Sequence, residues 1–366
     1  MLAEAMHSKR TESVANATTG LIQAGRLGVS AIGHGLAMAK GLEVKHAIKQ
    51  VDRLLSNGKL DVWKLFGVWV PYAVGSRNEI VVALDWTEFD HDDQSTIALH
   101  LVTRHGRATP LMWLTVVKSE LAGWRNAHED RLLGRLREVL PEGVQVTVLA
   151  DRGFGDAKLY GLLEELCFDY IIRFRENIAV EDAHGDSRPA AQWVPVNGRP
   201  KMLKEACVTA EHHPVPAVVC VKAKGMKDAW CLASSRDDLT GAGIVKLYGR
   251  RFTIEENFRD SKDLNFGMGL SKTRISKPER RDRLLFISAL AVALLTLLGA
   301  AGESLGMDRM LRANTAKYRT HSLFRQGCML FDLLANMRVD KKRKLLTRFG
   351  KFMIEQDFCS QAFGWI

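Results

Sequence analysis

The spacing of apolar residues along the chain changes near residue 79. Residues 1–75 show the three- to four-residue spacing of helices, which is clearest over 36–57. The chain then becomes rich in β-formers, and it predicts, in order, a strand over 79–89, two strands within 94–116, a helix over 126–140, a strand over 144–150, a helix around 161–167 and a strand over 170–175. Three strands, a helix and then strand–helix–strand is the element order of a ribonuclease-H-like mixed sheet.

The second half of the chain is less regular. Residues 176–235 hold Gly-, Pro- and Asp-rich turns and short strand-like runs, which predict a β-rich insertion. A long helix begins over 241–248 and runs past Lys262. The regions we predict are 1–75, a helical domain; 76–175, the first part of the α/β core; 176–235, the insertion; 236–302, the rest of the core with the long helix and an apolar helix; and 303–366, a C-terminal helical region.

The apolar helix, residues 284–301, is almost long enough to span a bilayer. Arg280, Arg281 and Arg283 lie directly before it, and the sequence offers no second candidate span. We therefore favour a helix that is buried in a large core over a membrane span, and we expect no membrane partner. Because residues of this helix are apolar on every side, protein should cover all its faces.

The charge of the chain points to a polyanionic partner. Its 52 basic and 42 acidic residues leave a net charge of +10. Within 36–57, Lys45, Lys49 and Arg53 repeat at four-residue intervals and share one helix face, which could neutralise DNA phosphates or could simply be solvated. The six cysteines are widely spaced and lack zinc-ligand spacing, as expected for reduced thiols in the cytoplasm.

Two aspartates follow apolar strand-like runs. Asp85 follows IVVAL and Asp151 follows VTVLA. If the two strands are neighbours, both carboxylates point into one cleft at the carboxyl edge of the sheet. Carboxylate oxygens are the ligands that Mg²⁺ and Mn²⁺ prefer, and two such ions can activate the attacking oxygen and stabilise the leaving oxygen in phosphoryl transfer. Either residue alone could instead be an aspartate that caps a turn, the role we expect of Asp156.

A third carboxylate lies in the segment 248–262. On a regular helix, Tyr248, Arg251, Glu255 and Lys262 project within a sector of roughly 60°, at about 100° per residue. One face would then carry an aromatic ring, a carboxylate and two cations, which suits a metal ligand flanked by phosphate contacts. A surface helix with ordinary ion pairs is the alternative.

These residues resemble a known family. Y-x2-R-x3-E-x6-K is the signature around the third acid of the insertion-sequence-four transposases, and residues 248–262 match it. The stretches LDWT, ADRGF, AWCLASS and FGMGLSKTR resemble the transposon-ten branch in the same order, over roughly residues 20–350. The resemblance implies a ribonuclease-H-like core, the catalytic and metal-binding triad Asp85, Asp151 and Glu255, Mg²⁺ with Mn²⁺ as substitute, and cut-and-paste transposition through a DNA hairpin.

The resemblance also implies where DNA lies. Tyr248, Arg251 and Lys262 would hold phosphates near the cleavage point, and Trp230 would stack on a base or belong to the core of the insertion. The basic cluster that begins at Lys272 and Arg274 and continues to Arg283 would extend the DNA path. The partners would be double-stranded DNA at the terminal inverted repeats, bound by residues 1–75, target DNA, and a second copy of the chain, at the nucleoid of a bacterial cytoplasm.

Three alternatives remain. A ribonuclease-H-like nuclease would cut DNA without joining it to a target. A catalytically inactive protein would bind the same DNA ends, for example as an inhibitor of transposition. A membrane protein built on residues 284–301 would require detergent for solubility.

Overall fold

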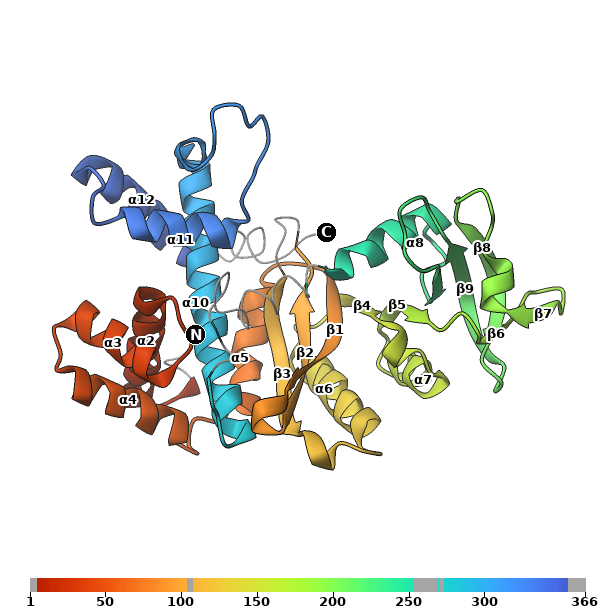
Figure 1. Cartoon of the computed structure of the whole chain (residues 1–366), viewed down its shortest axis with the longest axis horizontal. Coiled ribbons are helices and arrows are strands. Elements are labelled where there is room, and N and C mark those ends of the chain that lie inside the picture. Colours follow the sequence, from red (N-terminus) through yellow and green to blue (C-terminus); the bar gives the residue numbers. More distant parts are fainter. Residues whose placement is uncertain (1–4, 104–107, 253, 255–268, 270–272, 355–366) are drawn as a thin grey trace.

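The computed structural model describes residues 5–103, 108–252, 254, 269 and 273–354. A mixed sheet runs from the centre to one end of the molecule, and a long helix separates its central part from a group of N-terminal helices (Figure 1). The N-terminal helices are α2 (Ser8–Ala24), α3 (Val29–Lys40) and α4 (Val44–Ser56), and the long helix is α10 (Pro278–Ser304). The C-terminal helices α11 (Leu323–Leu333) and α12 (Val339–Ile354) pack against α10 toward its C-terminal end.

The sheet has the ribonuclease-H-like arrangement that the element order predicts. Its described strands follow the order β3-β2-β1-β4-β5-β10-β9-β8-β6-β7. β1 is antiparallel to β2 and parallel to β4, which is in turn parallel to β5. The first five strands are β1 (Glu79–Phe89), β2 (Gln94–Leu101), β3 (Thr109–Val117), β4 (Gln145–Ala150) and β5 (Asp169–Phe174). The chain therefore has a mixed α/β fold of the predicted class.

The β-rich segment after β5 extends this same sheet. Its last strand returns to pair antiparallel with β5, so the segment adds strands at the edge and forms no separate sheet among the described residues. These strands are β6 (Ala179–Glu181), β7 (Ser187–Pro189), β8 (Lys201–Val208), β9 (His213–Val221) and β10 (Trp230–Ser234). The boundaries 176 and 235 of the predicted insertion remain a prediction, as do those of the other regions.

The two faces of the sheet belong to different apolar clusters because side chains alternate along a strand. Val82 and Leu84 of β1 join the large core, and α5 (Val62–Val74), α6 (Arg125–Val139) and α7 (Ala157–Glu165) pack against the strands from the helical layers. Val81 and Ala83 point the other way, into a smaller cluster with residues of α8 (Gly241–Tyr248). This alternation decides which face each functional residue of β1 and β4 occupies.

Helix α10 is covered by protein, as its apolar sequence predicts. It contacts α2, α4, β3, α11 and α12, and 78% of its most apolar stretch is buried. By length and composition it is the one candidate membrane span among the described residues. Gly299 of α10 and Gly327 of α11 allow the two helices to touch closely, since a Cβ at either position would overlap a backbone carbonyl of the facing helix.

The arginines at the start of α10 hold elements together. Arg281 is fully buried, pairs with Asp92, donates to Gln94 over 2.7 Å and stacks on Phe89. Asp92, whose side chain is 9% exposed, supplies the counter-charge of this buried guanidinium. Arg280 pairs with Asp52, and Arg283 donates to backbone carbonyls at the end of α4 and beyond it. These three arginines therefore connect α10 to η1 (Asp90–Asp92) and α4, a role that the predicted DNA path did not include.

Arg281→Ala is expected to lower the free energy of unfolding by about 3–5 kcal/mol, because it leaves the Asp92 carboxylate buried without its counter-charge. Urea unfolding followed by circular dichroism measures the change. Arg280→Ala is the matched control, since its partner Asp52 is solvent-exposed and such a pair contributes about 0–1 kcal/mol. Equal losses in the two variants would contradict this account of Arg281.

Candidate active site

Asp85 and Asp151 occupy equivalent positions on two adjacent parallel strands. The last parallel pair of β1 and β4 is Leu84 with Ala150, so each aspartate is the next residue along its strand. By alternation both lie on the face of Ala83 and Leu149, which is the face that α8 covers. Asp85 does not end its strand, because β1 continues beside β2 to Phe89. What ends at Leu84 is the pairing with β4, and this opens the sheet edge at the two acids.

A single arginine lies between the two carboxylates. Nη1 of Arg251 is 3.3 Å from Oδ2 of Asp85, and Nη2 is 3.8 Å from Oδ2 of Asp151. The arginine side chain is 4% exposed, whereas those of Asp85 and Asp151 are 23% and 37% exposed. Two acids that are far apart in sequence thus share one planar cation in a site that remains open to solvent.

The other oxygen of each carboxylate is held by the backbone. Oδ1 of Asp85 accepts from the Trp86 amide over 2.9 Å, and Oδ1 of Asp151 accepts from the Arg152 amide over 2.7 Å. The same local contact orients both side chains, so the Oδ2 atoms are the ones presented to a cation. Asp156 caps α7 by accepting from the Leu159 amide, as predicted, and it is not part of this pair.

The segment that carries the predicted third acid begins as a helix and then changes its winding. α8 ends at Tyr248, and η5 (Gly249–Arg251) is a 3₁₀ turn. The prediction of one regular helix through this segment is therefore wrong at residues 249–251, because a 3₁₀ turn rotates successive side chains by about 120° instead of 100°. Glu255, Lys262 and Lys272 lie outside the described residues.

Tyr248 and Arg251 are both buried, at 1% and 3% exposure. Burial raises the pKa of the Tyr248 hydroxyl above its usual range, so that it stays a neutral hydrogen-bonding group. In this conformation both side chains face the protein and not solvent. A direct contact with DNA, which the sequence predicts for both, requires a rearrangement.

Aromatic rings flank the arginine. Trp230, the first residue of β10, packs edge-on against Tyr248 with ring centres 5.0 Å apart, and it lies 5.9 Å from the ring of Phe252. Trp230 is only half-buried, and Phe252 is 42% exposed. The structure therefore places Trp230 beside the motif residues, with part of its ring accessible, and not wholly inside a core.

The sequence analysis missed a buried acid on the opposite face of β1. Trp86 follows Asp85, so its indole points to α6, where Nε1 donates to Oε1 of Glu129 over 2.7 Å. Burial is the main reason why the pKa of Glu129 rises to about 7, and Asp156 adds to this effect while the Trp86 bond opposes it. The available signal was spacing: Glu129 falls on the apolar stripe that continues with Leu132 and Leu136 of the same helix.

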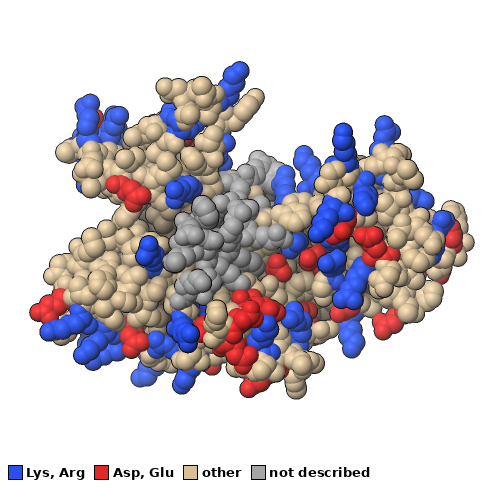
Figure 2. All heavy atoms as spheres, viewed as in Figure 1, with Lys and Arg blue, Asp and Glu red and all other residues tan. Residues whose placement is uncertain are grey.

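The other predicted DNA contacts lie away from the acids. Lys45, Lys49 and Arg53 are exposed on one face of α4, where basic side chains gather along the edge of the N-terminal helices (Figure 2). Lys49 and Arg53 line a hollow of about 470 Å³ with Arg10 of α2. Lys45 is close to Glu43, at 3.1 Å.

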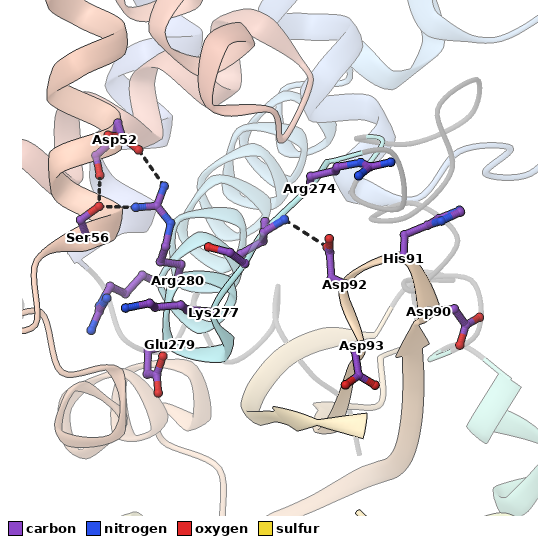
Figure 3. Close-up of a pocket in the computed structure, with 13 residues that line it drawn as sticks. Asp52, Ser56, Asp90, His91, Asp92, Asp93, Arg274, Lys277, Glu279 and Arg280 are labelled. Carbon is purple, nitrogen blue, oxygen red and sulfur yellow. Dashed lines mark hydrogen bonds and ion pairs between the residues drawn. The ribbon is translucent and has the colours of Figure 1, made fainter. Parts of the chain in front are cut away.

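Arg274 lines a different cavity of about 900 Å³, which lies between α4, η1 and the start of α10 (Figure 3). Acidic side chains of residues 90–93 form one wall, and Lys277 and Arg280 lie on the other side. Neither Asp85 nor Asp151 lines this cavity. Its mixed charge and its ion pairs fit a junction between elements better than a DNA channel.

Asp85 and Asp151 are the described residues that could hold a metal ion at the sheet edge. They fit the role because the Oδ2 atoms of both carboxylates lie close to one positive charge, the Arg251 guanidinium. No group of three possible ligands among His, Cys, Asp and Glu occurs in the part of the chain that the structure describes. A third protein ligand would have to come from elsewhere, and Glu255 follows Arg251 by four residues.

The family model described as "Transposase DDE domain" matches residues 77–294, which is more than half of the chain. The chain belongs to the DDE transposase family. No curated protein matches it. The matched range contains both described acids and Glu255, and the family normally uses divalent metal ions and acts on DNA. Two aspartates at the carboxyl edge of adjacent parallel strands can together hold a divalent metal ion.

Glu129→Gln is expected to make this transposase more stable at about pH 8 but not at about pH 4.5. The folded protein keeps the Glu129 proton up to a pKa of about 7, whereas the unfolded chain releases it near 4.5, so stability falls between these values as pH rises. Glutamine keeps the acceptor for Trp86 and removes this loss, which amounts to at most about 3 kcal/mol.

Urea midpoints across this pH range measure the difference. Glu138→Gln, on the same helix but with a side chain 65% exposed, is the control and should show no such gain. A Glu129→Gln variant whose advantage over wild type does not change with pH would contradict the assignment.

Proposed function

We propose that this transposase excises and integrates an insertion sequence by cut-and-paste, as an insertion-sequence-four member of the transposon-ten-like branch. The observation that carries the proposal is the meeting of Asp85 and Asp151 with Arg251 of the Y-x2-R-x3-E-x6-K segment. Arg251 is 100 residues from Asp151 and 166 residues from Asp85 in the chain, yet it reaches the same sheet edge. A shared site is what the signature requires if Glu255 is the third acid.

Asp85, Asp151 and Glu255 would hold two Mg²⁺ ions, or Mn²⁺ in their place, which would activate the attacking oxygen and stabilise the leaving oxygen. Water would cut one strand at the element end and release a 3′-OH. That hydroxyl would attack the opposite strand to form a hairpin, a second water would open the hairpin, and the 3′-OH would join target DNA. Trp230, which is half-buried beside Tyr248, would stack on an unpaired base at the hairpin.

The DNA would also contact surfaces away from the acids. The exposed stripe Lys45, Lys49 and Arg53 on α4 suits the backbone of a terminal repeat. The cluster that begins at Lys272 and Arg274 would extend the DNA path, and Lys262 would contact phosphates nearer to the cut. Two copies of the chain would bridge two DNA ends, in the cytoplasm of a bacterium.

Cleavage of end-labelled DNA that carries the flanking element ends, with Mg²⁺, tests the reaction. Wild type should give a hairpin and then joined product, and Glu255→Gln or Asp85→Asn should lower the cleavage rate by at least about a hundredfold. Asp156→Asn is the matched control, because asparagine still caps α7 and Asp156 is not in the site.

Full cleavage by Glu255→Gln would remove Glu255 from the triad. DNA binding without cleavage by wild type would favour the inactive DNA-binding protein, and cleavage without joining would favour the nuclease.

The α4 stripe makes a separate prediction about DNA affinity. Each phosphate contact contributes about 0.9 to the slope of log affinity against log salt, so Lys49→Gln with Arg53→Gln should lower the slope by about two. Fluorescence anisotropy of labelled duplex over a salt series measures it. Lys64→Gln, an 84% exposed lysine on α5, removes charge elsewhere and should leave the slope unchanged. An unchanged slope in the double variant would show that the stripe is a solvated face.

A further inference from the structure

We propose that Arg251 couples metal binding to DNA binding: its guanidinium holds Asp85 and Asp151 together in the free protein and leaves them for a DNA phosphate when metal enters. The proposal rests on the proposed function, because it assigns a metal to the acids and a DNA ligand to the protein. It changes the role of Arg251 from a residue that only grips DNA to one that also controls when the site accepts metal.

The first observation is that Arg251 occupies the side of the carboxylates that metal needs. Each Oδ1 atom accepts a hydrogen bond from a backbone amide, and Arg251 is 3.3 Å and 3.8 Å from the two Oδ2 atoms. A divalent cation bound at the same oxygens would lie within a few ångströms of the guanidinium. Repulsion between the two cations lowers metal affinity for as long as Arg251 stays in place.

The second observation is that Arg251 is buried, so losing its contacts with Asp85 and Asp151 is costly while the side chain stays in this position. Its side chain is 4% exposed, and a buried guanidinium without an anion is strongly unfavourable. When metal takes the carboxylates, another anion can take over their contacts with the guanidinium. A phosphate group accepts the same two-pronged contact that a carboxylate does, and DNA brings phosphates to this edge of the sheet.

The third observation is a place where the backbone can change. Arg251 ends the 3₁₀ turn η5, which interrupts the helical winding directly after α8, and short 3₁₀ stretches within helices often mark hinges. Gly249 lies in this turn beside the ring of Trp230, with no atom closer than 3.8 Å to the position of a Cβ. Phe252, the next residue after Arg251, is 42% exposed, so the turn borders solvent.

Mn²⁺ binding to the full-length protein, followed by the electron paramagnetic resonance signal of free Mn²⁺, tests the coupling without using activity. In the absence of DNA, the dissociation constant for Mn²⁺ should be lower in Arg251→Gln than in wild type by a factor of at least about ten. A short duplex should raise the Mn²⁺ affinity of wild type, and this effect should be lost in Arg251→Gln, since linked equilibria must share one coupling factor. Duplex alone, and the Asp85→Asn protein with duplex, provide the blanks.

Two controls define the cause. Lys246→Gln removes the same charge from an exposed position on α8 and should behave as wild type. Asp85→Asn combined with Arg251→Gln should abolish the increase in Mn²⁺ affinity. This result would show that the increase depends on Mn²⁺ binding at the two acids. Because Arg251→Gln could affect folding, the melting temperature is measured with and without Mn²⁺, and the stabilisation by Mn²⁺ should be larger in Arg251→Gln than in wild type.

The proposal is overturned if Arg251→Gln binds Mn²⁺ no more tightly than wild type, if Lys246→Gln gains as much, or if DNA raises the affinity of both proteins by the same factor. These outcomes are separate from the cleavage assay. A wild-type protein that cleaves element ends while Arg251→Gln gains no Mn²⁺ affinity would refute the coupling alone. A gain that depends on Asp85, in a protein that never cleaves, would refute the proposed function alone.

Discussion

The parallel ladder between β1 and β4 is the constraint on which the candidate active site depends. It is hydrogen-bonded from Glu79 with Gln145 to Leu84 with Ala150, and it fixes the register of two strands whose paired residues are 66 positions apart in the chain. Because side chains alternate strictly, a shift of one residue would send Asp85 or Asp151 to the opposite face of the sheet. The ladder therefore determines both that the acids meet and on which face they meet.

The same alternation gives β1 two neighbouring residues with different surroundings. Asp85 faces the α8 side and shares Arg251 with Asp151, while Trp86 faces α6 and binds Glu129. The amide of Trp86 also orients the Asp85 carboxylate. Packing on the helical face thus supports the geometry of the acidic face through one residue of the strand.

Helix α10 is the second organising element. It joins the N-terminal helices, the edge strand β3 and the C-terminal helices, and its first turn is anchored by arginines whose partners are Asp92, Asp52 and backbone carbonyls. Positive charge in this chain therefore has two uses. Some of it neutralises buried acids and helix ends inside the molecule, and some, as on α4, stays exposed to solvent.

The sequence by itself determined the order of strands and helices in the core, the burial of α10, the capping role of Asp156 and the two acids of the sheet edge. A local pattern predicts each of these features: period-two and period-3.6 spacing of apolar residues, a long apolar run, a capping residue at a helix start, and an acid after a strand-like run. The match to the DDE transposase family over residues 77–294 agrees with that reading.

Tertiary structure alone decided the partners of the charges. Arg251 and Arg281 look alike in sequence, each in a basic segment, yet one lies between Asp85 and Asp151 and the other is buried against Asp92. The 3₁₀ turn at η5 and the burial of Glu129 were likewise decided by tertiary contacts. Their states depend on which distant groups are brought within a few ångströms and on how much water is excluded, and neither quantity is encoded in the spacing of residues along one segment.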